Sequence, residues 1–226
     1  MDAAAVTTLE AGRTPARPYP VRLDVAPATH DRNRLTTAFR LVLAVPHLLL
    51  VGGPIAATLS WPWGSDNSEL GMTGGALGLV AGVSALIAWF AIVFTGRAPQ
   101  GLRDLASFYV RWRVKAVAYT ALLRDEYPPF GDGPYPVSVD LTPPDAPRNR
   151  LTVAFRIILA IPQILAVWAL GIGWAVTTLV AWVAIMFTGE FPPSLYRFGV
   201  GVLRWSTRVE TYVLLLHDEY PPFSLE

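Results

Sequence analysis

The chain has 226 residues, of which 53% are hydrophobic and 15% are charged, and its formal net charge is +1. Soluble domains carry about 25% charged residues, so this composition favours a small multi-pass membrane protein over a soluble domain of the same length. Because the chain contains no cysteine, disulfide frameworks, thiolate metal sites and cysteine nucleophiles are excluded.

Residues 1–18 contain no apolar stretch that could serve as a secretory signal peptide, and we expect a disordered cytoplasmic tail there. From residue 19 onward the same motifs occur twice in the same order, which indicates a tandem duplication. We therefore expect a first copy at residues 19–130 and a second copy at residues 131–226. The matching motifs are YPVRLD at 19–24 and YPVSVD at 135–140, RNRLTTAFR at 32–40 and RNRLTVAFR at 148–156, FTG at 94–96 and 187–189, and DEYPPF at 125–130 and 218–223.

The spacing of these motifs shows where the copies differ in length. Motifs before the apolar segments are offset by 116 positions (19 to 135), and motifs after them are offset by 93 positions (94 to 187). The first copy therefore carries 23 additional residues between its two apolar segments.

The apolar segments predict membrane helices, because a span needs about 20 mainly apolar residues. In the first copy we expect helices at about 35–60 and 74–95. In the second copy the apolar run is unbroken, long for one helix and short for two. We expect two helices there, at about 151–170 and 173–188, around a turn at residues 171–173. One long tilted span and a shallow re-entrant hairpin are the alternatives.

The distribution of basic residues predicts on which side of the membrane each segment lies. No Lys or Arg occurs between Leu41 and Gly96 or between Ile157 and Tyr196. The positive-inside rule then places the N-terminal, central and C-terminal regions in the cytoplasm. Each copy must therefore cross the membrane and return, which predicts four membrane helices with both termini cytoplasmic.

The segments after the apolar runs, at about 100–124 and 193–217, have apolar residues at alternating steps of three and four, as in an amphipathic helix. We expect these helices to lie on the inner membrane surface with their basic residues on lipid phosphates. The alternative is that their apolar stripe packs on the protein's own hairpin. The basic residues proposed for lipid headgroups in these helices are Arg111, Lys115, Arg204 and Arg208.

The expected fold is therefore an all-α membrane protein of two parallel tandem repeats. Each repeat consists of a transmembrane helical hairpin and a cytoplasmic-side amphipathic interfacial helix. Short extended segments are expected at the YPV sequences, 19–21 and 135–137, because apolar residues alternate there.

The RNRLT motifs contain the best-marked polar residues of the sequence. Asn33 and Asn149 are predicted N-caps of the helices that follow. The arginines around them could form an anionic-lipid or phosphate site, because guanidinium groups match phosphate geometry. The alternative is membrane anchoring together with ion pairs to the acids of DEYPPF. The arginines in question are Arg34, Arg40, Arg150 and Arg156, and the candidate ion-pair acids are Asp125, Glu126, Asp218 and Glu219.

The sequence contains no recognisable catalytic, cofactor-binding or metal-binding pattern. The three histidines have no metal-ligand spacing, and nucleotide-binding and hydrolase motifs are absent. His47 is the only titratable side chain inside a predicted membrane helix, and Gln163 stands at the matching position of the second copy. We expect no enzymatic activity, no cofactor and no metal.

The ordered set YPV-x-x-D, NRLT-x-x-FR-x-x-L-A-x-P, FTG and DEYPPF resembles a family of bacterial, largely actinobacterial, membrane proteins known as domain of unknown function 4389. The resemblance covers almost the whole chain after residue 18, as two copies. It implies a bacterial cytoplasmic membrane and brings no established activity or site residue.

We expect a non-enzymatic scaffold or accessory subunit of a membrane complex, with anionic lipid at the cytoplasmic interface as a candidate ligand. The expected partners are membrane lipids and other membrane subunits or further copies of the chain, and nucleic acid is not expected. A small oligomeric transporter or channel is the alternative function, and a membrane enzyme ranks third.

Overall fold

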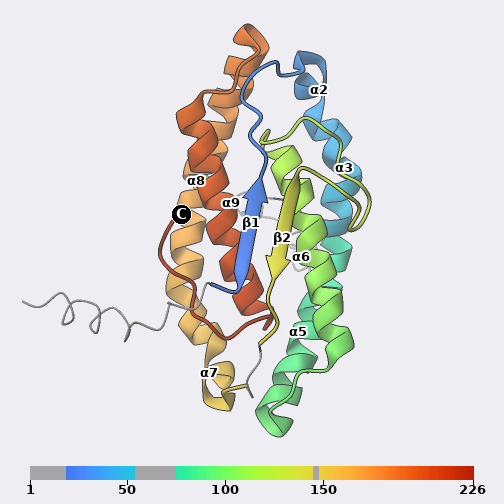
Figure 1. The fold of residues 1–226 in the computed structure, drawn as a ribbon, viewed down its shortest axis with the longest axis vertical. Helices are drawn as coiled ribbons and strands as arrows, with labels where there is room; N and C mark the ends of the chain where they lie inside the picture. The colour runs from blue at the N-terminus through green and yellow to red at the C-terminus, as the bar shows by residue number, and fades with distance from the viewer. Residues whose placement is uncertain (1–18, 54–74, 145–147) are drawn as a thin grey trace, which may run out of the picture.

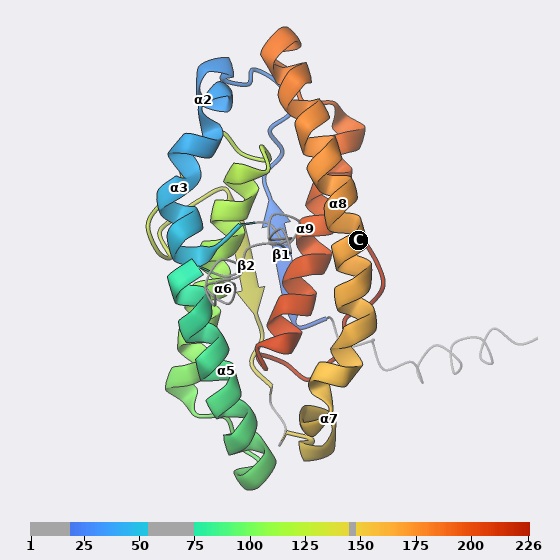
Figure 2. The same ribbon diagram turned by 180° about the vertical axis from the view of Figure 1, so that it is seen from behind.

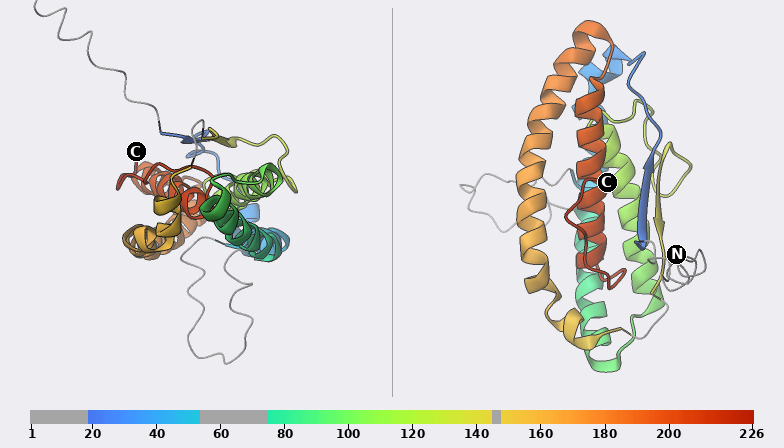
Figure 3. Two further views of the ribbon diagram at one scale, coloured as in Figure 1. Left: turned by 90° about the horizontal axis from the view of Figure 1, so that it is seen from below. Right: turned by 60° about the vertical axis from the view of Figure 1, so that its left-hand side comes forward.

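The computed structural model describes residues 19–53, 75–144 and 148–226. The expected N-terminal tail and the last part of the first predicted membrane helix, residues 54–60, lie outside the described residues. The described chain is mostly helical, as predicted, and is arranged in three layers (Figure 3): a two-stranded ribbon, a middle pair of helices and an outer layer of apolar helices.

The ribbon consists of β1 (Val21–Val25) and β2 (Val137–Leu141), which pair antiparallel. The predicted extended segments, 19–21 and 135–137, overlap these strands at Val21 and Val137, where the strands begin. Leu23 pairs with Val139, and these two residues occupy the same position in the two copies. Equivalent residues face each other in this way only across a two-fold axis. The two copies are therefore related by a pseudo-two-fold axis that runs through the centre of the ribbon.

The middle layer contains α6 (Gln100–Thr120) and α9 (Pro193–Val213), which are the equivalent helices of the two copies. Their aromatic residues at helical spacing are buried, including Trp112, Tyr119, Trp205 and Tyr212. Each helix packs on the ribbon on one side and on the outer helices on the other. The prediction that these apolar stripes contact lipid is therefore wrong. The structure shows the alternative, in which the stripes pack within the protein.

The outer layer of the second copy is one helix. After the short α7 (Arg150–Ala154), α8 runs without interruption from Arg156 to Thr188. The predicted turn at residues 171–173 is wrong, and so is the hairpin that depended on it. A glycine costs only about 1 kcal/mol in a helix, which does not break an apolar segment that packs along its length. A Cβ at Gly173 would lie 3.6 Å from the ring of Phe198, an ordinary contact, so this position accommodates the helix without strain.

The outer layer of the first copy is the same helix with an interruption. After α2 (Arg34–Ala38), α3 (Arg40–Val51) and α5 (Gly75–Thr95) follow one another along one line rather than side by side (Figure 2). A Cβ on Gly75, whose φ is +66°, would lie 2.5 Å from the carbonyl carbon of Leu50, so only glycine fits at this junction. The predicted hairpin is wrong here too.

Helix lengths show that the 23 additional residues were inserted at one point. The 12 residues of α3 and the 21 of α5 together equal the 33 residues of α8. By the motif offsets, Val51 corresponds to Val167 and Gly75 to Trp168, which are neighbours in α8. The insertion is therefore residues 52–74.

The two copies interlock instead of forming separate halves. The Nε1 of Trp182 on α8 donates a hydrogen bond to the carbonyl oxygen of Thr37 in α2 (3.1 Å), and Trp89 on α5 donates equivalently to Val153 in α7 (2.9 Å). One buried hydrophobic cluster contains residues of both copies. The long helices of the two copies run in opposite directions (Figure 1), as the axis through the ribbon requires.

Candidate functional site

The outer helices expose an extended apolar surface. Of the 35 large hydrophobic side chains that are exposed among the described residues, 30 lie within residues 35–49, 79–94 and 151–187. Two helices, α5 and α8, are long and apolar enough to cross a membrane, and only 22% of the most apolar stretch of each is buried. A core helix of a soluble protein would be mostly buried. We call the exposed side of α3, α5 and α8 the outer face.

The outer face carries no charge in the described part of the chain. The 66 residues of α3, α5 and α8 include two charged side chains, Arg40 and Arg156, and each is only 1% exposed. His47 and Gln163, on the same helices, are also buried. Their side chains accept hydrogen bonds from Trp112 Nε1 (3.0 Å) and Trp205 Nε1 (2.8 Å), respectively. These polar groups all point into the protein.

The opposite side of the molecule, which we call the ribbon face, is polar. Arg22, Asp24, Ser138 and Asp140 alternate with the buried residues of the strands and are exposed. Arg22 lies directly opposite Asp140 in the register, and opposite charges across a ribbon stabilise the pairing. The outer and ribbon faces are therefore the apolar and the charged surface of one flat molecule.

Four of the predicted lipid-binding residues lie toward the ribbon face and contact the protein itself. Arg111 Nη1 and Lys115 Nζ bind Asp132 at 3.2 and 2.9 Å. Arg204 donates to the carbonyl of Leu23 at 3.5 Å, and Arg208 stacks over the ring of Tyr19 at 5.5 Å. The structure therefore places these four side chains on the protein itself, away from the outer face, and their contact with lipid headgroups stays a prediction.

Arg40 and Arg156 form two equivalent buried ion pairs. Arg40 Nη2 lies 2.5 Å from Asp125 Oδ1, and Arg156 Nη2 lies 2.5 Å from Asp218 Oδ1. Each guanidinium also stacks on a tyrosine ring, Tyr119 at 4.3 Å or Tyr212 at 4.4 Å, and donates to backbone carbonyls. Of the two interpretations of these arginines, the structure shows the ion pairs to the DEYPPF acids, and burial with these partners leaves neither group free for a lipid headgroup.

A second arginine completes each set. Arg32 and Arg148 bind the same two aspartates at 2.8 Å and donate to the carbonyls of Leu122 (2.5 Å) and Leu215 (3.0 Å). We call Arg32, Arg40 and Asp125 the first Arg–Asp cluster, and Arg148, Arg156 and Asp218 the second. Each cluster thus holds the turn that ends α6 or α9.

These turns are unfavourable without the arginines. Leu122 and Leu215 have φ values of 64° and 62°, a left-handed conformation that costs an L-residue about 1–2 kcal/mol. The chemistry of the clusters is therefore structural: they hold strained turns and close each copy on itself. The sequence analysis does not single out Arg32 and Arg148. The signal for them is that the RNR and DEYPPF motifs both occur in each copy, so that each aspartate has the same candidate arginine partner.

The remaining predicted residues lie at the ends of the molecule or beside the clusters. Arg34 and Arg150 are exposed, and each reaches across to the FTG glycine of the other copy, Gly189 or Gly96. Glu126 pairs with Arg124. Glu219 lies 3.8 Å from His217 Nδ1, and burial together with the nearby Arg156 lowers the pKa of His217 to about 4. The predicted N-caps Asn33 and Asn149 are confirmed.

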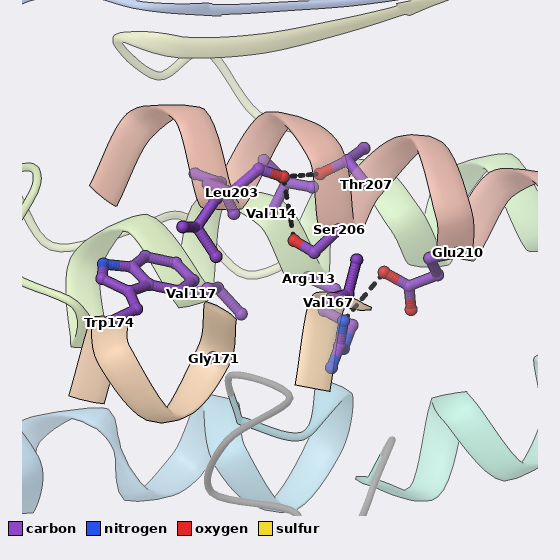
Figure 4. Close-up of a pocket in the computed structure, with 11 residues that line it drawn as sticks. Arg113, Val114, Val117, Val167, Gly171, Trp174, Leu203, Ser206, Thr207 and Glu210 are labelled. Atoms are coloured by element: carbon purple, nitrogen blue, oxygen red, sulfur yellow. Dashed lines mark hydrogen bonds and ion pairs between the residues drawn. The ribbon is translucent and has the colours of Figure 1, made fainter. Parts of the chain in front are cut away.

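One buried ion pair breaks the two-fold symmetry. Arg113 on α6 binds Glu210 on α9 at 2.8 Å and donates to the carbonyl of Gly53, at the end of α3, also at 2.8 Å. The corresponding residues of the other copies are Ser206 and Val117. Figure 4 shows this pair beside a small cavity between α6, α8 and α9 of about 10 Å³, which holds about one water molecule.

A larger groove opens between α2, α3 and α8. Its volume is about 480 Å³, and its walls are mainly apolar. Its lining includes Trp174 and Trp182 of α8, Leu41 of α3, and Thr120–Leu122 at the end of α6. Small-molecule sites fall in this size range. Among the described residues, no three His, Asp or Glu side chains are placed to hold a metal ion.

Comparison with known proteins identifies the family and no individual relative. No curated protein and no solved structure matches the chain. The family described as "Domain of unknown function (DUF4389)" matches residues 71–131 and 150–224, which is more than half of the chain, and each matched segment contains one FTG and one DEYPPF motif. The chain therefore belongs to the DUF4389 family and carries two tandem copies of its domain.

Proposed function

We propose that this protein is a non-enzymatic membrane protein that binds the lipid bilayer through its outer face and serves as a scaffold or accessory subunit of a membrane complex. The observation that carries the proposal is the outer face itself, an uncharged surface over the described length of α3, α5 and α8. Soluble monomers rarely expose apolar patches larger than a few hundred Å². The cytoplasmic membrane, with both termini on its inner side, is the proposed location.

Two features support lipid as the ligand. Arg34 and Arg150 are exposed at opposite ends of the outer helices, where guanidinium groups can bind lipid phosphates. The apolar groove between α3 and α8 opens beside Leu41, whose side chain is 68% exposed on the outer face, and suits an acyl chain. The two exposed arginines match the phosphate headgroup of a phospholipid, and the apolar groove matches its acyl chain.

The partner proposal rests on the polar side of the molecule. When the outer face is covered by lipid, the ribbon face stays in water with its exposed charges of both signs. Such a surface favours specific contact with other subunits, or with further copies of the chain, through complementary charges. Mass spectrometry of the complex extracted from its own membrane identifies these partners, and repeated recovery of the protein alone, without lipid, contradicts the proposal.

Membrane binding is tested with charges on the outer face. Val83 and Val176 are exposed and equivalent in the two copies. We expect the double variant Val83→Glu/Val176→Glu to shift the protein from the membrane fraction to the soluble fraction, because each buried charge costs about 2.5–3.5 kcal/mol in lipid. Ser138→Glu on the ribbon face is the control and should stay bound. Equal binding of all three proteins contradicts the proposal.

Anionic lipid binding is tested at the arginines. We expect Arg34→Gln/Arg150→Gln to weaken binding to vesicles that contain phosphatidylglycerol by about 2 kcal/mol, since each basic residue near an anionic surface contributes about 1 kcal/mol. Binding to neutral phosphatidylcholine vesicles should not change. A flux assay in the same vesicles tests the alternative function, because a transporter or channel moves ions or small solutes across them and a scaffold does not.

A further inference from the structure

We infer that the protein lies flat in one leaflet of the membrane, with α3, α5 and α8 parallel to the bilayer plane, instead of crossing it. This inference rests on the proposed binding of the outer face to lipid and specifies its geometry. The structure allows two orientations of these helices relative to a membrane, upright or flat. Three features of the described residues exclude the upright orientation.

The first feature is the length of the exposed apolar surface. On α8 it extends from Ile157 to Phe187, which are 69% and 80% exposed, and this stretch is about 45 Å long at 1.5 Å per residue. The hydrocarbon core of a bilayer is about 30 Å thick. An upright α8 would have to tilt by close to 50° to bury all of it, and membrane helices tilt by about 0–40°. A flat helix buries the whole stretch at one depth.

The second feature is the position of the ribbon. Figure 1 shows β1 and β2 midway between the two ends of the molecule, alongside the long helices. An upright orientation would place the exposed Arg22, Asp24 and Asp140 near the bilayer centre, at about 2.5–3.5 kcal/mol each. Each strand also has one edge that pairs with no other strand in the described part of the chain, and open strand edges do not occur in lipid. The flat orientation leaves the ribbon in water.

The third feature is the pseudo-two-fold axis. It passes through the ribbon between Leu23 and Val139 and continues between α6 and α9 to the outer face (Figure 3). In an upright molecule this axis lies in the membrane plane, so that the RNR arginines of one copy face the outside. In a flat molecule it runs along the membrane normal, and all basic segments lie on one side. Only the flat orientation satisfies the positive-inside rule.

The occupant of the outer face is a bilayer and not a second protein surface. Protein interfaces combine an apolar centre with a polar rim, whereas α3, α5 and α8 expose no charged side chain along their described length. The charges are separated by depth, with the ribbon face polar and the outer face apolar, which is the pattern of helices that lie in a membrane interface.

Single-cysteine labelling distinguishes the orientations, and the chain suits this test because it has no native cysteine. Gln100 at the start of α6 and Ser194 at the start of α9 are exposed and lie at opposite ends of the long axis. We propose Gln100→Cys, Ser194→Cys and Ser138→Cys, each treated with a membrane-impermeant maleimide in inside-out and right-side-out membrane vesicles.

The flat orientation predicts that all three cysteines react from the cytoplasmic side and none from the other. Reaction of Gln100→Cys and Ser194→Cys from opposite sides overturns the inference and leaves the proposed function intact. Loss of the protein from washed membranes overturns the proposed function instead. Val83 is exposed on the outer face, and Val83→Cys is the lipid-side control. It should stay unreactive in vesicles and react after the membrane is dissolved in a denaturing detergent.

Discussion

The two copies contain the same Arg–Asp cluster at their turns but differ in their outer helix. In the second copy α8 is continuous, whereas in the first copy residues 52–74 interrupt the helix between α3 and α5. The features that occur twice are those that the fold requires: the clusters, the N-caps and the tryptophan contacts between copies. The ion pair of Arg113 with Glu210 occurs once and lies where the helix is interrupted.

The single ion pair illustrates this difference. Arg113 binds the carbonyl of Gly53, where α3 ends, and also Glu210 of the other copy. A helix end leaves carbonyl groups without partners inside the helix, and α8 has no such end at the corresponding position. We therefore interpret Arg113 and Glu210 as an adaptation to the insertion, and the Arg–Asp clusters as the shared requirement.

The largest effects are expected at the clusters. Arg40→Ala or Arg156→Ala removes one of the two arginines that bind each aspartate, while Arg32 or Arg148 still binds the carboxylate. We expect a cost of about 3 kcal/mol, at the lower end of the range for breaking a buried ion pair. We expect both variants to lose a similar amount of unfolding free energy, measured by chemical denaturation in detergent. The exposed Arg34→Ala is the control and should change stability by less than about 0.5 kcal/mol. Unequal losses at Arg40 and Arg156 would show that the two clusters are not equivalent.

The symmetry-breaking pair gives the next effect. Arg113→Ser, which introduces the residue of the other copy, leaves the partly buried Glu210 without its cationic partner and should cost about 3 kcal/mol. Adding Glu210→Val should recover most of this loss, because replacing a whole buried pair by smaller neutral groups is often neutral. Denaturation of the single and double variants gives the coupling energy directly. A double variant that is less stable than the single one would contradict this interpretation.

The sequence predicted the repeat and the N-caps, because these depend on local residue identity. It did not predict how the apolar segments are arranged. The rule that basic residues stay inside requires the chain to return after each apolar run, and a hairpin is one way to do so. A single long helix that lies along the membrane surface, as we propose for α8, satisfies the same rule without crossing. The structure distinguishes this helix from a hairpin through the contacts of α8 with α9 and α2.

The candidate site shows the same limit. For Arg40 and Arg156 the sequence allows two interpretations, a lipid-phosphate site or ion pairs to the DEYPPF acids, and the structure shows the ion pairs. Whether an arginine binds a phosphate or a carboxylate depends on which groups the fold brings within reach. Asp125 is 85 positions from Arg40, and no local pattern encodes such a contact. The twice-repeated pairing of RNR with DEYPPF was the one signal in the sequence that favoured it.

A smaller difference between the copies concerns His217, whose counterpart is Arg124. Burial and Arg156 lower the pKa of His217 to about 4, below the ordinary value of about 6.5. The contribution of His217 to the free energy of unfolding is therefore fully present above pH 6.5. It falls as the pH decreases toward 4, because the unfolded chain takes up a proton on this histidine that the native protein excludes. The full loss is about 3 kcal/mol.

His217→Gln isolates this contribution, since glutamine does not titrate and can still bond to the hydroxyl of Thr211, which lies 3.0 Å from His217 Nε2. We expect the stability difference between wild type and variant to depend on pH between 6.5 and 4 and to be constant above pH 7. His30→Gln, at an exposed histidine, should reproduce the wild-type profile. A difference that does not vary with pH would mean that His217 contributes by packing alone.

The smallest effect is expected when the interruption itself is removed. Deleting residues 52–74 joins Val51 to Gly75 and should give one helix of 33 residues, the length of α8. We expect the stability to change by about 1 kcal/mol or less, because the lost bond from Arg113 to Gly53 is offset by helix hydrogen bonds across the junction. Denaturation and the membrane fraction are the measurements. If the shortened protein folds but its partners no longer copurify with it from the membrane, residues 52–74 are the part of the chain that contacts those partners. The two copies then differ in function because of these residues alone.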